Sequence, residues 1–285
     1  MRHDPEVQRV VSTYQLGLPR MPVAGRSGEL LGRGTGSSVE FQEYREYLPG
    51  DDIRHLDWAT YARSDALMVR LYREEISPRT EILLDASKSM TTGDGSKERV
   101  AKQLATVFAQ LCGYLGGRPT LIPANNERPL RPMGLEGLDA LAAFPCDGVA
   151  TLTELLTESA IPLKPQAVRI VISDFLFPHD PDPLLRRLAA GASALWIVQL
   201  ITAWEAEPSE LGGRRVIDIE GGGQTDMLVN RKAIATYKER LWRLQAGLSR
   251  ACRRVHARYV LLIAERGLEA LCREELCAAE MLRLG

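Results

Sequence analysis

The sequence lacks several features that would place it in a common class of protein. Its 285 residues contain no apolar run that approaches the roughly 18 residues needed to span a bilayer. Its first residues lack the apolar core of a secretory signal. With 36 Lys+Arg against 37 Asp+Glu, the net charge of −1 gives no reason to expect a nucleic acid or an acidic membrane surface as partner. We therefore expect a cytoplasmic, soluble protein with no membrane span and no nucleic-acid partner.

Cysteine and histidine are scarce and follow no metal-binding or catalytic spacing. The five cysteines are odd in number and widely spaced, which favours reduced, mostly buried thiols. None of the four histidines is paired with a Ser or Cys nucleophile, so a Ser-His-Asp hydrolase has no support. The glycine-rich stretch "GRGTGSS" lacks the lysine of a P-loop and does not open a helix. These absences exclude the common hydrolase and nucleotide-binding patterns.

From about residue 81 onward, strand-like and helix-like segments alternate. The strand candidates are short apolar runs, typical of a parallel sheet buried on both faces: "EILLDAS", "PTLIPA", "VRIVISDF", "ALWIVQLI", "RRVIDIE" and "YVLLIA". Apolar residues at helical spacing predict helices over Glu98–Leu115 and Arg231–His256, and Gly267–Leu284 is expected to form one more helix over the sheet. The alternation predicts an α/β fold with a doubly wound, mostly parallel sheet.

Residues 1–78 have a different composition, dense in Gly, Arg, Asp and aromatics. The alternating stretch Leu67–Tyr72 predicts small strands. We expect residues 1–78 to form a small β-containing N-terminal subdomain and residues 79–285 to form the α/β domain. The block "PGDDIRHLDW" favours a structural role over a catalytic one, since no paired acids converge on an evident pocket. The expected charge network that holds the subdomain to the main fold, with Trp58 as its apolar anchor, comprises Asp51, Asp52, Arg54, Asp57 and Arg63.

Two of the apolar strands end at an aspartate, Asp85 and Asp174. In a doubly wound sheet, ligands bind outside the carboxyl ends of the strands, so both carboxylates should lie at that edge. Ser87 and Ser89 follow the first aspartate at alternate positions, and a threonine precedes a helix-like run further on. Serines in such a loop also cap helices, but oxygen ligands of this kind suit Mg²⁺ or Mn²⁺. The proposed metal ligands are Asp85, Ser87, Ser89, Thr151 and Asp174, with Thr153 as the alternative to Thr151.

These ligands resemble the metal-ion-dependent adhesion site (MIDAS) of von Willebrand factor A domains, which combines Asp-x-Ser-x-Ser with a later Thr and Asp. In addition, "VEFQEYREYLPGDDIRHLDWATYAR", "RLYREE" and "LLDASKSM" are similar to domain-of-unknown-function family fifty-eight (DUF58), over roughly residues 28–285. One departure is that the family commonly has Gly-Thr before the helix of the third loop, where this chain has Ala150 before Thr151.

The resemblance implies a von Willebrand factor A-like fold and a magnesium-binding site with an open coordination position. A protein partner would supply an acidic residue to that position. The implied partner is a MoxR-type AAA+ ATPase or its client.

The sequence therefore favours a non-enzymatic, Mg²⁺-dependent protein-interaction module. An alternative is a Mg²⁺-dependent phosphohydrolase with Asp85 as nucleophile. That chemistry would be expected to place a second acid where Ser87 stands, and a cation against the phosphate. A third, weaker alternative is a structural subunit whose acidic edge never binds metal.

Overall fold

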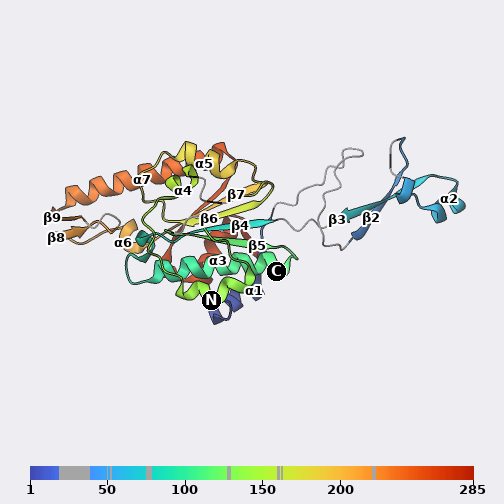
Figure 1. Ribbon diagram of the computed structural model, residues 1–285. Coiled ribbons are helices and arrows are strands. Elements are labelled where there is room, and N and C mark those ends of the chain that lie inside the picture. The colour runs from blue at the N-terminus through green and yellow to red at the C-terminus, as the bar shows by residue number, and fades with distance from the viewer. Residues whose placement is uncertain are drawn as a thin grey trace. The chain divides into compact units, whose positions relative to one another are not determined.

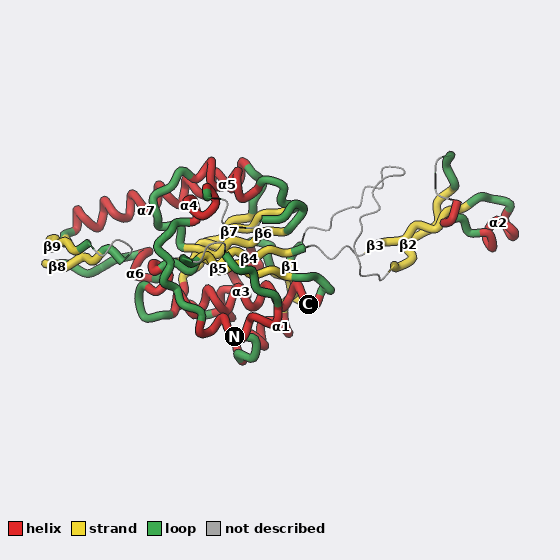
Figure 2. The backbone as a smooth tube through the Cα atoms, viewed as in Figure 1, coloured by secondary structure: helices red, strands yellow, loops and turns green. Residues whose placement is uncertain are grey.

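The chain divides into two units in the computed structural model: Met1–Leu18 with Pro78–Gly285, and Pro19–Ser77 (Figures 1 and 2). The structure describes residues 1–18, 39–49, 51, 53–74, 79–126, 130–158, 161, 163–219 and 223–285. The larger unit contains the parallel sheet and both strand-end aspartates, so it is the unit that positions the candidate site.

A five-stranded parallel sheet forms the centre of the larger unit, as the alternating segments predict. Its strands lie in the order β10 (Arg258–Ile263), β7 (Ala194–Ile201), β6 (Val168–Ser173), β4 (Thr80–Asp85) and β5 (Pro119–Ala124). The chain passes from β4 to β5 on one side and then returns to β6 on the other side of β4. The strand order therefore reverses at β4, and the ends of β4 and β6 flank the switch point where such sheets bind ligands.

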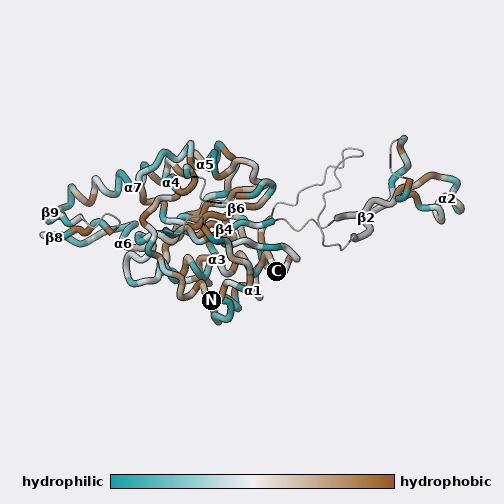
Figure 3. The backbone as a smooth tube through the Cα atoms, in the orientation of Figure 1, coloured by the Kyte–Doolittle hydropathy of each residue, from teal (hydrophilic) through white to brown (hydrophobic). Residues whose placement is uncertain are grey.

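Helices cover both faces of this sheet, which explains why its strands are almost continuously apolar. On one face, Ile82 and Leu84 pack with α1 (Pro5–Thr13), α3 (Ser96–Tyr114) and α8 (Leu268–Leu271). On the other face, Leu83 and Val171 pack with α4 (Leu152–Thr157), α5 (Pro181–Ala189) and the second half of α7 (Arg231–Arg254). The hydropathy colouring shows the same apolar centre (Figure 3).

The N-terminal residues belong to the larger unit, which differs from the expected subdomain boundary of 1–78. Val7, Val10 and Val11 of α1 are buried in the same cluster as α3. Strand β1 (Tyr14–Leu16) pairs antiparallel with β11 (Leu282–Leu284), so both ends of the chain lie in one small sheet. The sequence pattern of α1 resembles any amphipathic helix and does not indicate which unit it packs against.

Two other expectations were wrong. The segment "RRVIDIE" does not join the parallel sheet, because β8 (Gly212–Ile217) pairs antiparallel with β9 (Gln224–Val229) in a separate, exposed hairpin. The helix expected over Gly267–Leu284 is shorter: α8 continues into a π-helical turn (Cys272–Leu276), and the chain then forms β11. A short helix, α6 (Ala203–Ala206), connects β7 to the hairpin.

The smaller unit contains an antiparallel pair, β2 (Val39–Glu46) with β3 (Met68–Glu74), which confirms the small strands predicted there. Helix α2 (Trp58–Ser64) lies between them in sequence and is capped by Asp57, whose carboxylate accepts from the amides of Ala59 and Thr60. Asp51 pairs with Arg45. Trp58 contacts Tyr61 edge-on but is 62% exposed, so it is not an internal anchor of this unit. Asp52 lies outside the described residues.

All five cysteines are free, and three of them are buried, in agreement with the expectation of reduced thiols. Among the described residues, no helix combines the length and the apolarity that a bilayer crossing requires.

A buried ion pair joins the amino-terminal ends of β4 and β6. The guanidinium Nε of Arg169 donates to Glu81 at 3.0 Å, and its other nitrogens donate to three backbone carbonyls, those of Lys164, Leu188 and Ala190. Both side chains are at most 3% exposed. Removing one partner of such a pair leaves the other charge buried without compensation.

We expect Glu81→Gln to lower the free energy of unfolding by about 3–5 kcal/mol, because the Arg169 charge then remains buried and unpaired. Urea denaturation measures this. The matched control is Glu239→Gln, which breaks an exposed pair with Arg243 within α7 and should change stability by less than about 0.5 kcal/mol. Equal effects of the two substitutions would contradict this reading of the buried pair.

Candidate metal centre

The register of β4 with β6 brings the two strand-end aspartates to the same edge of the sheet. Leu84 pairs with Ile172, so Asp85 lies beside Ser173 and Asp174 is the next residue along the chain. Asp85 is 4% exposed and Asp174 is fully buried. The structure thus brings together two of the residues that the sequence proposes as ligands.

The carboxylate of Asp85 is held by two hydrogen bonds. Its Oδ1 accepts from the amide of Ser87 at 2.9 Å, and its Oδ2 accepts from the hydroxyl of Ser173 at 2.6 Å. The Ser173 hydroxyl in turn accepts from the amide of Phe175 at 3.0 Å, which orients its proton toward the carboxylate. The side chain therefore has a defined direction.

The hydroxyls of Ser87 and Ser89 converge beside this carboxylate. Their Oγ atoms are 3.0 Å apart. Two neighbouring ligands of an octahedral Mg²⁺, each about 2.1 Å from the ion, are also separated by about 3 Å. The spacing of the two serines therefore suits the ion that the sequence predicts.

The third loop lies against the loop that follows β4. The amide of Gly148 donates to the carbonyl of Ala86 at 2.9 Å, and the amide of Lys88 donates to the carbonyl of Gly148 at 3.0 Å. A Cβ atom at Gly148 would lie 3.0 Å from the Ala86 oxygen, a tight contact, so this close approach favours glycine. The loop thereby brings the start of α4 toward the serines.

Of the two threonines considered as ligands, Thr151 is the N-cap of α4. Its hydroxyl accepts from the amide of Glu154 at 3.3 Å, and its own amide donates to the Glu154 carboxylate at 2.7 Å, forming a capping box. The hydroxyl also donates to that carboxylate at 3.0 Å. The hydroxyl of Thr153 is buried and has no hydrogen-bond partner among the described residues. The Thr151 hydroxyl is thus engaged in the cap, whereas that of Thr153 is uncommitted, and both assignments are proposals.

A buried lysine, which the sequence reasoning missed, lies beside Asp174. The ammonium of Lys97 donates to Asp174 at 2.7 Å, to both carboxylate oxygens of Glu205 at 2.9 and 3.1 Å, and to the carbonyl of Ser89 at 3.1 Å. The Lys97 side chain is fully buried. This side chain therefore connects the serine loop, the end of β6 and helix α6.

Sequence reasoning missed Glu205 as well as Lys97, although each residue carries a recognisable sequence signal. Lys97 lies on the extension of the apolar stripe of α3, three residues before Val100 and seven before Leu104, where a charge is unexpected. Glu205 is the last residue of a Thr-x-x-Glu capping box that starts at Thr202. What neither signal indicates is that the two side chains meet.

The electrostatics of the edge leave an excess of negative charge. The buried carboxylates here are those of Asp85, Asp174 and Glu205, and the ammonium of Lys97 pairs with the last two. With every carboxyl ionised, these formal charges sum to −2. Burial, and then the charge of Asp174, raises the pKa of the Asp85 carboxyl, although hydrogen bonds from Ser173 and Ser87 oppose the shift. A divalent cation would neutralise this excess. The oxygen donors and the charge together fit Mg²⁺ or Mn²⁺.

The carboxylates at this edge do not by themselves form a metal-binding group. Within the part of the chain that the structure describes, no three His, Cys, Asp or Glu side chains are placed so that they could hold a metal ion. Cation binding would accordingly depend on hydroxyl and water oxygens as well as on carboxylates.

Comparison with known proteins places these features in a family. A family model described as "Protein of unknown function DUF58" matches residues 43–245, a range that contains Asp85 and Asp174. Uncharacterized proteins of Mycobacterium bovis and Mycobacterium tuberculosis are 25% identical over 233 residues, which cover 77% of this chain and 73% of each relative.

Two solved structures are similar at a lower level. The conserved hypothetical protein BatB from Bacteroides thetaiotaomicron has 12% identity and a TM-score of 0.41, with 69% of this chain and 98% of that chain covered. An aerotolerance-related membrane protein from Bacteroides fragilis, with multiple mutations to serines, has 12% identity and a TM-score of 0.39 at the same coverage.

We expect Lys97→Met to lower the free energy of unfolding by about 3–5 kcal/mol, because Asp174 and Glu205 then lose their buried counter-charge. Denaturant titration measures this loss.

Lys88→Met is the matched control, since Lys88 is half-buried in the turn that follows β4 and makes no ion pair with another described residue. It should leave stability within about 0.5 kcal/mol of the parent protein. A Lys97→Met protein as stable as this control would show that the ammonium is not needed to balance the edge.

Proposed function

This chain belongs to the DUF58 family of proteins of unknown function, and we propose that it is a non-enzymatic, Mg²⁺-dependent protein-interaction module. The observation that carries the proposal is the convergence of the Ser87 and Ser89 hydroxyls beside two buried carboxylates at the switch point of the sheet. Mn²⁺ accepts the same oxygens and is the alternative ion.

Each residue has a distinct part in this proposal. Ser87 and Ser89 offer direct oxygen ligands, and Thr151 or Thr153 offers a third hydroxyl. Asp85 and Asp174 supply the negative charge, either directly or through water. When bound, the ion supplies a Lewis-acid position to which a partner's carboxylate can add. The surrounding hydrogen bonds hold the protein ligands before any partner arrives, which reduces the ordering needed on binding.

The finer assignment rests on the resemblance to the adhesion site of von Willebrand factor A domains. The parallel sheet with helices on both faces and the strand-end position of the site support a von Willebrand factor A-like fold. The resemblance also supports a MoxR-type AAA+ ATPase, or its client, as the protein that supplies the acidic residue. We place the interaction in the cytoplasm.

The competing phosphohydrolase is less well supported by the geometry. A nucleophilic Asp85 would need a free carboxylate oxygen facing the substrate, whereas both of its oxygens accept hydrogen bonds and the residue is 4% exposed. The nearest buried cation, Lys97, is committed to Asp174 and Glu205. An interaction site requires neither a free nucleophile nor a spare cation.

We expect Mg²⁺ to raise the melting temperature of the purified protein, because a ligand that binds only the folded state adds RT ln(1 + [L]/Kd) to its stability. Ser87→Ala/Ser89→Ala should abolish the increase, and calorimetric titration should show no Mg²⁺ binding by that variant. Thr91→Ala is the matched control: Thr91 lies in the same turn, but its hydroxyl donates to the carbonyl of Lys88. An equal response of the serine variant and the parent would contradict the metal centre.

Partner binding is tested with a purified MoxR-type ATPase from the same genome. The Mg²⁺ concentration is kept constant throughout, so that the ATPase keeps its own ion. The parent chain and Thr91→Ala should bind, whereas Ser87→Ala/Ser89→Ala should bind at least about tenfold more weakly. Unchanged binding of the serine variant would show that the metal does not take part in binding this partner.

A further inference from the structure

A projecting arm rises from the same edge of the sheet as the candidate metal centre. We define the arm as hairpin β8–β9 together with the first half of α7, residues 231–242 (Figure 1). Strand β7 ends at Ile201, and the chain passes through α6 directly into β8. Because Asp174 follows the neighbouring strand β6, the arm starts beside the metal centre.

Contacts tie the base of the arm to that centre. The hydroxyl of Tyr237 in α7 donates to the carbonyl of Glu205 at 2.7 Å. The Glu205 carboxylate binds Lys97, which binds Asp174. From Tyr237 toward Arg231 the helix extends about 9 Å further, at about 1.5 Å per residue. The arm is therefore anchored at the edge and reaches beyond it.

The hairpin of the arm is uncovered on both faces. Register places Met227 opposite Arg214 on one face and Leu228 opposite Gly213 on the other. Ile217 is 59% exposed and Leu228 is 68% exposed. Within the described residues, β8 and β9 pair with no third strand. An isolated two-stranded hairpin is only marginally stable in water, and exposed apolar clusters mark interaction surfaces.

The arm is also strongly basic in a chain of nearly balanced charge. Strands β8 and β9 and residues 231–242 of α7 together hold six Lys or Arg against two Asp or Glu, whereas the whole chain has a net charge of −1. Three of these cations form ion pairs: Arg214 with Glu210, Arg215 with Asp226 and Lys238 with Glu207.

The first half of α7 carries cations that remain available to a partner. The exposed cations of Arg231, Lys232 and Arg240 form no ion pair with any residue that the structure describes. Trp242, 66% exposed, lies on the same helix. Arginine and tryptophan beside apolar residues are the composition of an interface that binds an acidic partner.

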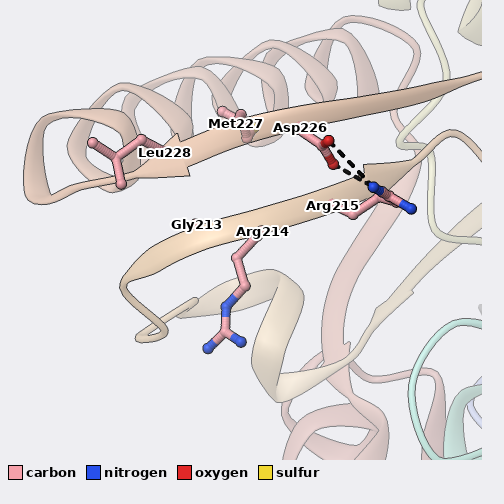
Figure 4. Close-up of a pocket in the computed structure, with 6 residues that line it drawn as sticks. All are labelled: Gly213, Arg214, Arg215, Asp226, Met227 and Leu228. Carbon is pink, nitrogen blue, oxygen red and sulfur yellow. Dashed lines mark hydrogen bonds and ion pairs between the residues drawn. The ribbon is translucent and has the colours of Figure 1, made fainter.

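A surface depression on the hairpin adds shape to this charge. It has a volume of about 540 Å³ and is lined by Gly213, Arg214, Arg215, Asp226, Met227 and Leu228. Figure 4 shows Arg215 bridged to Asp226 across the two strands, while the Arg214 guanidinium points away from the hairpin. An extended segment can pair with the open edge of either strand and place alternate side chains on each face.

We infer that the arm is the docking surface for an extended, acidic protein segment, which lies along it and delivers one carboxylate to the cation at the edge of the sheet. This inference rests on the proposed function for its last step only. Acidic side chains of the segment pair with Arg231, Lys232 and Arg240, and its apolar side chains cover Leu228 and Trp242. The arm provides the selectivity for sequence that a single carboxylate–metal contact lacks.

The test uses the full chain and a fluorescent peptide of alternating Glu and Leu, with a matched Gln and Leu peptide. Fluorescence anisotropy should show binding of the Glu peptide, weaker binding of the Gln peptide, and a loss of affinity as salt increases. Arg231→Glu/Lys232→Glu/Arg240→Glu should weaken binding of the Glu peptide about tenfold or more. Arg231 and Lys232 lie in the first turn of α7, where glutamate favours the helix dipole, and Arg240 is exposed, so the variant should stay folded.

The matched control reverses three exposed arginines away from the arm, Arg118→Glu/Arg186→Glu/Arg250→Glu, with the same change in net charge. It should reduce binding by less than about threefold, since distant exposed charges are screened. Trp242→Ala, which keeps every charge, should weaken binding of the Glu peptide and leave the salt dependence of that binding unchanged. If the arm-reversed protein and the control bind the peptide equally, the inference is overturned.

The same assay tests the proposed metal centre independently of the arm. Chelation and Ser87→Ala/Ser89→Ala should remove only the Mg²⁺-dependent part of the peptide affinity, leaving the arm-dependent part. If the serine variant binds the Glu peptide like the parent and the arm variant binds it more weakly, the arm is supported and the proposed metal centre is contradicted. If anionic phospholipid vesicles or a single-stranded oligonucleotide bind the arm and the Glu peptide does not, the acidic protein segment is ruled out.

Discussion

The parallel pairing of β4 with β6 is the constraint on which the candidate site depends. It sets Asp85 beside Ser173 and makes Asp174 the next residue at the same edge. That pairing in turn requires both faces of the strands to be covered, since their residues are apolar on each side. Helices on both faces supply this cover, and the carboxyl edge of the sheet is where buried carboxylates can collect.

Buried carboxylates that lie close together need a positive charge nearby, and the protein supplies one such charge from its own side chains. Lys97 extends from the first turn of α3 to Asp174 and Glu205 and also binds the carbonyl of Ser89. With Asp85, Asp174 and Glu205 ionised, this single ammonium leaves a formal balance of −2, which a divalent cation would neutralise. The same contacts lead outward through α6 to Tyr237 and the basic arm. Binding of an ion and binding of a partner would therefore act on connected parts of the molecule.

Much of the fold could be predicted from local pattern. All five sheet strands and the parallel arrangement follow from short apolar runs, and α3 and α7 follow from apolar residues at helical spacing. The segment "RRVIDIE" misled because its Val and Ile residues suit a strand of any kind, and β propensity does not separate a buried strand from an exposed one. The sequence also did not indicate that residues 1–18 belong to the larger unit, because β1 pairs with a strand at the opposite end of the chain.

The sequence by itself determined the chemistry that this edge can offer: two aspartates at strand ends, two serines at alternate positions, and threonines before a helix. Those residues follow directly from local order, because a strand, its loop and the next helix are continuous. Only the tertiary structure decided which charges meet. Lys97 and Glu205 are 108 residues apart, and no periodicity links them. The same holds for the arm, since its basic and apolar residues are ordinary in composition and become a surface only because no other described element covers them.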